Sequence, residues 1–328
     1  MTSIGRPGAT EATRMSARSA CTPERVQCGN CGTTEQVCIS SPCGPRCTLC
    51  FTEQVERSFR YAVQRNVMLS HGERVAVALS GGPASLALLE LLVRLRRGFP
   101  VKRGKARPKH FDLVVLHVSV PVEFGGHGAA GAAALKALVE KRYGLTLQTT
   151  DASVVSARLQ DHVNRMYKDA SNESVSNTRD SSQQSMLLAD TVKELILSST
   201  IQHKCSKLFL GTTITRAATI TIARVAAGSI HRLGGEIAVD RAVPPMALAG
   251  EASAPLLAPR VLRPLREVST REVVRYLRCA GYTDWITPTQ PHFYETLESA
   301  AERFIWRASE TRPATSFSVV HSIERAMK

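Results

Sequence analysis

The sequence predicts an α/β fold, in which a parallel sheet carries helices on both faces, preceded by a small cysteine-rich unit. Three observations predict it. From residue 74 onward, short apolar runs typical of buried strands alternate with segments of helical periodicity. The first of these runs, 74–79, passes directly into the glycine turn 80–85, Ser-Gly-Gly-Pro-Ala-Ser, as a strand does before a helix. Seven of the nine cysteines lie between Cys21 and Cys50, which indicates metal binding rather than a disulfide scaffold.

The N-terminal fifth of the chain divides into three parts. Residues 1–25 are rich in Ser, Thr, Ala and Arg without hydrophobic periodicity, and we expect a disordered leader. Residues 26–50 hold the cysteines. A helix over 51–66 follows, because apolar residues recur there every four positions on one face. The cysteine segment and this helix form one expected unit, 26–66.

Residues 67–228 are expected to form the α/β domain. Its predicted strands are 74–79, 111–120, 145–150 and 207–210, and its predicted helices are 86–95, 129–143, 187–203 and 217–227. In a parallel sheet, ligands bind at the carboxyl ends of the strands. The loops there are 80–85, 117–128 and 211–216. His117 lies at this edge, but we assign it no role because a lone histidine is usually a paired structural residue.

Two insertions and a C-terminal region complete the chain. Residues 98–110 read as a basic loop, and 168–185 are so polar that we expect them to be mobile. The C-terminal region, 229–328, begins with a Gly-, Ala- and Pro-rich irregular connection over 229–260. Its expected helices are 272–279, opened by a capping box from Ser269 to Glu272, and about 294–309.

The chain is strongly basic, with a formal net charge of +14 and a pI near 9.7. This charge favours an anionic partner, most simply nucleic acid. Residues 91–110 contain eight Lys or Arg and no acid, so they are the candidate RNA-binding segment; the alternative is an ordinary solvated loop. The RNA-binding candidates are Lys102, Arg103, Lys105, Arg107 and Lys109. No run reaches the roughly 18 apolar residues of a membrane span, and residues 1–20 lack the apolar core of a secretory signal.

The cysteines form two pairs with the spacing of a structural zinc ribbon. Cys28-x2-Cys31 and Cys47-x2-Cys50 are separated by fifteen residues. Four thiolates complete a tetrahedral Zn²⁺ site with no open coordination position, so the metal would be structural. The alternative is a set of unliganded or redox-sensitive thiols. Cys38 and Cys43 lie between the pairs and could substitute for one ligand.

The order of these parts resembles the cytoplasmic tRNA 2-thiolation protein 2 family, the non-catalytic subunits of the wobble-uridine thiolation complex. The resemblance covers roughly residues 28–310 and implies a Rossmann-like PP-loop fold, similar to the adenine nucleotide alpha-hydrolases, behind a zinc knuckle. The matching segments are Cys47-Thr-Leu-Cys50-Phe51, Gly72-Glu73-Arg74-Val75, the loop Ser80-Gly81-Gly82-Pro83-Ala84-Ser85, and Arg263-Pro264-Leu265.

This chain departs from the active relatives at the positions that carry chemistry. Ala84 stands where they have Asp, and a methyl group cannot hold Mg²⁺. Their second acidic motif appears here as the acid-free stretch 211–216, and the α/β domain has only the lone Cys205. The cysteine motif often found near the C-terminus of this subunit is absent, since no Cys follows Cys279. We therefore predict no catalytic residue in this chain, and these losses also argue against ATP and Mg²⁺ as its cofactors.

The loop can nevertheless hold a phosphate through Ser80, Gly81, Gly82 and Ser85, because that geometry needs only backbone N–H groups. The alternative is a glycine turn kept for the angle between strand and helix.

The resemblance implies an accessory subunit in a cytosolic heterodimer that binds tRNA and 2-thiolates its wobble uridines. A paralogous PP-loop partner would perform catalysis, with sulfur from a thiocarboxylated ubiquitin-related carrier. Two alternatives stay open: the chain is itself an ATP-dependent tRNA sulfurtransferase, or it is a zinc RNA-binding protein unrelated to thiolation.

Overall fold

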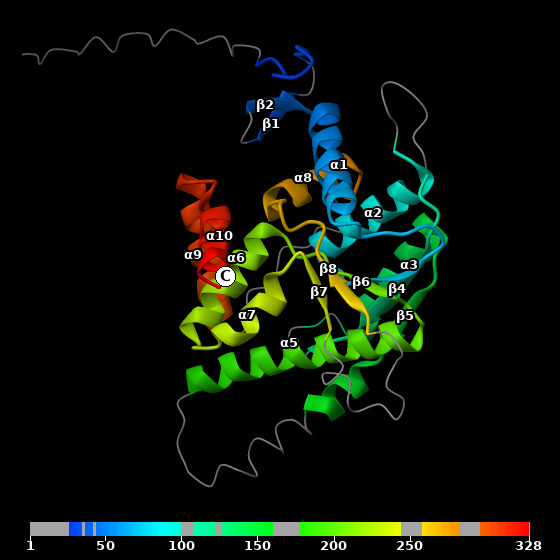
Figure 1. The fold of residues 1–328 in the computed structure, drawn as a ribbon, viewed down its shortest axis with the longest axis vertical. Helices are drawn as coiled ribbons and strands as arrows, with labels where there is room; N and C mark the ends of the chain where they lie inside the picture. Colours follow the sequence, from blue (N-terminus) through cyan, green and yellow to red (C-terminus); the bar gives the residue numbers. More distant parts are fainter. Residues whose placement is uncertain are drawn as a thin grey trace, which may run out of the picture.

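The computed structural model describes residues 26–34, 37–41, 44–99, 108–122, 126, 128–159, 177–243, 258–282 and 296–327 (Figure 1). The expected leader, 1–25, lies outside them. The strands are β1 (Val37–Ser41), β2 (Gly44–Cys47), β3 (Arg74–Ala78), β4 (Asp112–Val118), β5 (Leu147–Thr150), β6 (Lys207–Phe209), β7 (Asp240–Ala242) and β8 (Arg260–Leu262). The helices are α1 (Thr48–Arg65), α2 (Pro83–Arg97), α3 (Gly128–Tyr143), α5 (Asn177–Gln202), α6 (Ile214–Ala226), α7 (Ile230–Ile237), α8 (Thr270–Cys279), α9 (Leu297–Thr311) and α10 (Thr315–Ala326), with a further helix over 152–159.

Six strands form one sheet in the order β5-β4-β3-β6-β8-β7. All neighbours are parallel except β7, which runs antiparallel to β8 at the edge. The chain builds outward from β3 through β4 to β5, then returns to the other side of β3 for β6. The gap between the ends of β3 and β6 is therefore the topological switch point, where such sheets bind ligands. The predicted α/β fold with a mainly parallel sheet is confirmed.

Alternating residues of the central strands enter two separate cores. Val75 and Val77 of β3 join a large cluster covered by α1, α2, α3 and α8. Ala76, between them, belongs to a second cluster on the opposite face, covered by the 152–159 helix and α5. A strand buried on both faces must be apolar at every position, which is why 74–79 reads as a continuous apolar run rather than an alternating one.

A third core lies beside the sheet, where α6 packs against α7, α9 and α10. Figure 1 shows α9 and α10 side by side along α6. Arg266, fully buried after β8, pairs with Glu324 and so ties α10 to the sheet domain. Within the described residues, no helix combines the length and apolar character needed to cross a bilayer.

The sheet extends beyond the boundary expected at residue 228. α7 and β7 lie within the stretch 229–260 that was expected to be irregular, and β8 begins at its last residue. Each of these strands has only three residues, too few for a periodic pattern. β8 is fixed by pairing with β6, for example Val261 opposite Leu208. α10, which packs on α6, was also not expected.

The polar segment 168–185 is in part helical, contrary to the expected mobile insertion. α5 begins at Asn177, and 168–176 lie outside the described residues. Ser182 is buried, and its hydroxyl accepts a hydrogen bond from the Leu297 N–H at 3.1 Å, at the start of α9. Contact with a helix more than a hundred residues away therefore stabilises a segment whose composition alone favours disorder.

A buried polar network joins four helices around Glu90. Its carboxylate accepts hydrogen bonds from Arg94 Nε at 2.8 Å, Tyr143 at 2.9 Å and Tyr282 at 2.6 Å. Arg94 also pairs with Glu56 of α1. Burial acts to raise the pKa of Glu90, but the hydrogen bonds from Tyr282, Arg94 and Tyr143 hold it below its ordinary value. The network holds α1, α2, α3 and the end of α8 together.

Candidate functional site

The knuckle forms because two tight turns face each other. The Cys28 N–H donates to the Thr33 carbonyl at 2.8 Å, and the Gly32 N–H to the Cys28 carbonyl at 2.9 Å. Gly32 adopts φ +71°, a left-handed conformation that favours glycine. The second pair belongs to the β1–β2 hairpin and the helix behind it: Cys47 ends β2 and Cys50 lies in the first turn of α1.

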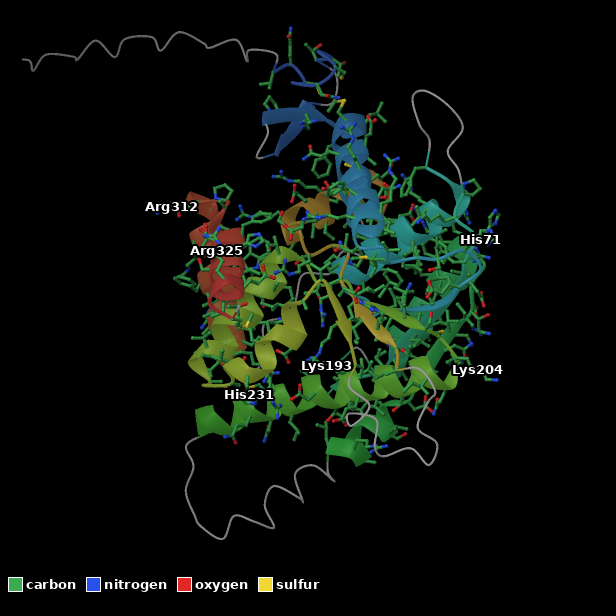
Figure 2. The ribbon with its side chains drawn as sticks, viewed as in Figure 1. His71, Lys193, Lys204, His231, Arg312 and Arg325 are labelled. Carbon is green, nitrogen blue, oxygen red and sulfur yellow. The ribbon has the colours of Figure 1, made fainter. Side chains whose placement is uncertain are left out.

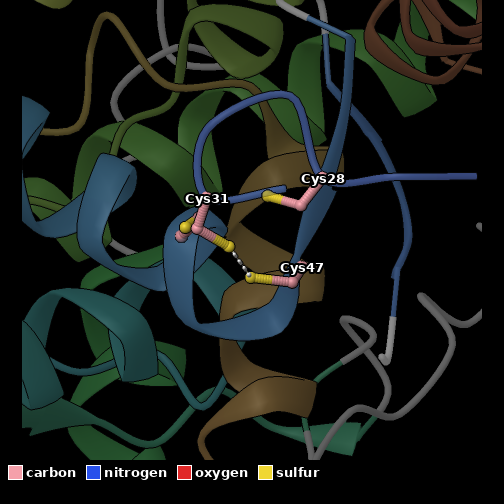
Figure 3. A group of neighbouring side chains, drawn as sticks. Cys28, Cys31 and Cys47 are labelled. Carbon is pink, nitrogen blue, oxygen red and sulfur yellow. Dashed lines mark hydrogen bonds between the residues drawn. The ribbon is translucent and has the colours of Figure 1, made fainter. Parts of the chain in front are cut away.

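The structure brings all four predicted metal ligands together. The sulfur atoms of Cys28, Cys31, Cys47 and Cys50 all lie within 4.8 Å of one another, and Cys31 Sγ is 3.7 Å from Cys47 Sγ (Figure 3). A tetrahedral ion with Zn–S bonds of about 2.3 Å places its sulfurs roughly 3.8 Å apart. The donor set therefore fits a single Zn²⁺ ion. An iron–sulfur cluster would need wider spacing, because each thiolate then binds a different iron.

Hydrogen bonding and burial shift the pKa values of two of these thiols in opposite directions. Hydrogen bonds from the backbone N–H groups of Cys47, Asn30 and Cys31 lower the pKa of Cys28 to about 6. At Cys50 the Asn30 amide lowers the pKa, but burial and the three neighbouring thiols outweigh it and raise the pKa to about 12. Four thiolates this close repel one another, so full ionisation requires a metal.

Asn30, which the sequence analysis did not single out, reaches across the knuckle to the other pair. Its side-chain amide donates to Cys50 Sγ at 3.2 Å. The sequence feature that could have identified Asn30 is a side-chain amide between the two cysteines of a Cys-x2-Cys turn. Directly behind Cys50, Phe51 is fully buried in the main core. The knuckle is thus anchored through α1, in agreement with the expected zinc knuckle and helix.

The candidate phosphate loop follows β3 at the switch point. Gly81 has φ +86°, and Gly82 is the N-cap of α2 with Pro83 after it. The Ser85 hydroxyl donates to the Gly82 carbonyl at 2.9 Å and lies 3.2 Å from the Ser80 hydroxyl. This places Ser80, Gly81, Gly82 and Ser85 in one turn at a helix N-terminus, a geometry suited to an anion.

The loop 211–216, which lies at the same edge of the sheet, touches the loop 80–85. A Cβ on Gly211 would lie 2.8 Å from the Ala84 carbonyl and 2.9 Å from the Ser85 nitrogen, so only glycine permits this approach. The Ala84 methyl packs against the main core. The position that is acidic in active relatives of the resembled family here contributes to packing.

The remaining side chains of 211–216 are engaged in helix contacts. Thr213 caps α6 and its hydroxyl lies 2.8 Å from that of Thr270. The Thr215 hydroxyl accepts from the Thr270 N–H at 3.2 Å, and Arg216 pairs with Glu298 of α9. This loop joins α6 to α8 and α9 and offers no carboxylate to a metal.

Arg263, in the predicted Arg-Pro-Leu segment, is buried and caps a helix. Its guanidinium donates to the carbonyls of Ala238 at 2.8 Å and Gly235 at 3.1 Å, at the C-terminus of α7. Burial, with Arg241 nearby, lowers its pKa to about 10. We interpret the Arg-Pro-Leu segment as a structural element of this fold.

Two further residues considered in the sequence are also buried. His117 Nδ1 lies 2.7 Å from the Leu79 carbonyl. Burial raises the pKa of the Cys205 thiol. Neither environment is that of a reactive group.

The basic segment is described only at its ends. Lys102, Arg103, Lys105 and Arg107 lie outside the described residues; Lys109 is half-buried and its N–H donates to the Leu95 carbonyl at 3.3 Å. Arg96 and Arg97 are exposed at the last turn of α2. Other exposed cations lie on the far side of the molecule, at the α9 and α10 helices, among them Arg312 and Arg325 (Figure 2). The positive charge is thus spread over several faces.

Solved structures share this fold. The U34-tRNA thiolase NcsA from Methanococcus maripaludis, solved with its [4Fe-4S] cluster, superposes with a TM-score of 0.62 at 17% identity, over 92% of this chain and 87% of that one. The fold is PP-loop-like. The NH3-dependent NAD synthetase from Campylobacter jejuni has a TM-score of 0.40 at 12% identity, over 85% of this chain and 92% of that one. No protein-family model matches the sequence, and no curated protein matches it.

The predicted fold class, a PP-loop-like α/β sheet with an N-terminal four-cysteine knuckle, is therefore confirmed. At 17% identity the thiolase shows the fold of this chain and not its reaction.

Proposed function

We propose that this chain is the accessory, non-catalytic subunit of a cytosolic complex that 2-thiolates the wobble uridines of tRNA. A paralogous PP-loop subunit would activate the uridine with ATP and accept sulfur from a thiocarboxylated ubiquitin-related carrier. The fold shared with a tRNA thiolase supports the general reaction. The knuckle would carry one structural Zn²⁺ on Cys28, Cys31, Cys47 and Cys50.

The observation that carries the accessory role is the contact between the two loops at the switch point. Ala84 faces the core, Gly211 lies against its backbone, and Thr213 and Thr215 bind α8. Position 84 and the loop 211–216, where Mg²⁺ ligands would be expected, are thus both occupied by residues that pack against other parts of the fold. The turn 80–85 would at most hold a phosphate through its N–H groups.

The cysteines support the same conclusion. Sulfur transfer needs thiols or a cluster near the substrate, and the thiolase NcsA was solved with a [4Fe-4S] cluster. Among the described residues of this chain, the knuckle is the one group of metal-binding side chains. The α/β stretch 67–228 contains a single cysteine, the buried Cys205. The partner would therefore have to supply the sulfur-carrying groups.

Isolated wild-type protein should release no AMP or pyrophosphate above background when incubated with ATP, Mg²⁺ and tRNA. Ala84→Asp should not restore turnover, because the 211–216 loop still lacks an acid and the α/β stretch still lacks a second cysteine. Pyrophosphate release distinguishes the proposal from the sulfurtransferase alternative.

The positive control is the complex recovered by affinity purification, in which mass spectrometry should find a PP-loop subunit with an intact Ser-Gly-Gly-x-Asp-Ser loop. tRNA-dependent turnover by the isolated chain would refute the accessory role. Unchanged 2-thiouridine after deletion of this protein would instead favour a zinc RNA-binding protein outside thiolation.

We further expect the basic segment to hold tRNA phosphates. Changing Lys102, Arg103, Lys105, Arg107 and Lys109 to Ala should weaken binding of different tRNAs alike, and each lost phosphate contact should reduce the slope of log K against log salt by roughly 0.7–0.9. Filter binding over a salt series measures this.

A control changes Arg312 and Arg325 to Ala, since these exposed cations lie on the α9 and α10 side of the molecule, far from the segment. If affinity and salt slope respond equally to both sets, or to neither, the segment is an ordinary solvated loop.

A further inference from the structure

The four knuckle cysteines are not equally buried. Cys28, Cys47 and Cys50 are 2%, 5% and 4% exposed, whereas Cys31 is exposed to solvent. Cys31 is thus the one member of the four-cysteine cluster that is open to solvent.

Hydrogen bonds increase this asymmetry. N–H donors on a thiolate withdraw electron density from sulfur and weaken it as a nucleophile. Cys50 Sγ receives such a bond from the Asn30 amide at 3.2 Å. The contact the structure shows for Cys31 Sγ is the sulfur of Cys47, 3.7 Å away (Figure 3).

We propose that Cys31 is a modification site, the thiolate through which soft electrophiles and peroxide attack and empty this metal centre. Coordination to Zn²⁺ keeps the sulfur deprotonated, and a thiolate that is also accessible reacts first. The inference rests on the zinc assignment within the proposed function, and metal analysis tests that assignment separately.

With peroxide the neighbouring sulfur completes the reaction. The Cys31 thiolate takes one oxygen atom from hydrogen peroxide, giving a sulfenic acid and hydroxide. The Cys47 thiolate then attacks the Cys31 sulfur, forming the disulfide and expelling a second hydroxide. Two thiolates, one peroxide and two protons thus give one disulfide and two waters, and Zn²⁺ leaves with two of its ligands lost.

The structural effect of losing the metal should be confined to the knuckle. Cys47 is the N-cap of α1 and Cys50 lies in its first turn, but Phe51, Val55 and Phe59 remain in the main core. Loss of the metal therefore frees the turns before α1 without removing the helix from the domain.

The test uses the full-length, zinc-loaded protein with Cys21, Cys38 and Cys43 changed to Ser, because these thiols would compete for reagent. Limiting N-ethylmaleimide is followed by peptide mass spectrometry, and a colorimetric chelator measures released zinc. Cys31 should be the first knuckle cysteine labelled, with zinc released in step with that label. Peroxide should give a Cys31–Cys47 cross-linked peptide.

A second variant keeps the metal while removing the thiolate. Cys31→His retains a four-ligand site of the common Cys₃His type, and zinc release by N-ethylmaleimide should slow by about tenfold or more. First labelling at Cys28, Cys47 or Cys50 overturns the proposal even if zinc is present. A purified protein without zinc overturns the zinc assignment and the proposal together.

Discussion

Changing Cys28 or Cys50 to Ser should reduce bound zinc from about one ion per chain to near zero. Each residue supplies one of four ligands, and the sulfurs are already at the spacing of a tetrahedral site. Structural zinc in small finger peptides binds with an apparent free energy of about 10–16 kcal/mol, most of which becomes folding energy. Among the described residues of the knuckle, the buried cluster consists of Cys28, Cys47 and Cys50, which are themselves ligands, so the knuckle should unfold locally when the metal is lost.

Metal analysis and limited proteolysis measure the two effects. Cleavage should appear within residues 26–50, while the α/β domain stays resistant because its cores do not include the knuckle. Cys279→Ser is the matched control: that thiol is half-buried on α8 and is not one of the four clustered cysteines, so zinc should be retained. A well-folded, metal-free wild type would contradict the zinc assignment.

Glu90→Ala should destabilise the whole domain by about 2–4 kcal/mol, because two buried tyrosine hydroxyls lose their acceptor at roughly 1–3 kcal/mol each, while Arg94 keeps its pair with Glu56. The change leaves the Tyr143 and Tyr282 hydroxyls and the Arg94 guanidinium without their shared acceptor. Since total stabilities are typically about 5–15 kcal/mol, urea unfolding should show a large shift of the midpoint.

The matched control is Glu53→Ala on α1. Its carboxylate makes a surface pair with Arg57 at 3.6 Å, and the expected loss is below about 0.5 kcal/mol. Equal losses in the free energy of unfolding for the two substitutions would show that the Glu90 network stabilises the fold no more than a surface ion pair does.

The contribution of Glu90 to the stability of the fold should depend on pH. The pKa of Glu90 in the folded protein lies below its ordinary value, so folding favours the ionised form. Its contribution is fully present above the unfolded pKa and is lost as the pH falls through the folded pKa. Glu90→Gln should therefore reduce stability at neutral pH and make its decline in acid shallower than in the wild type.

The sequence by itself determined the cluster of four cysteines, the main strands and the loop at the switch point. These features are local: two Cys-x2-Cys turns with fixed spacing, continuous apolar runs such as 74–79, and a glycine turn between strand and helix. The same is true of the capping box from Ser269 to Glu272, which opens α8 as expected.

Tertiary structure alone decided the rest. β7 and β8 are too short to show a pattern and exist because β6 offers an edge to β8, which in turn pairs with β7. The first turns of α5 contact α9 through Ser182. Glu90 lies in an otherwise apolar helical face, and only the folded chain brings Tyr143 and Tyr282 to it. The exposure of Cys31 and the packing of Ala84 against the core likewise depend on residues distant in sequence, because burial is a property of the assembled fold.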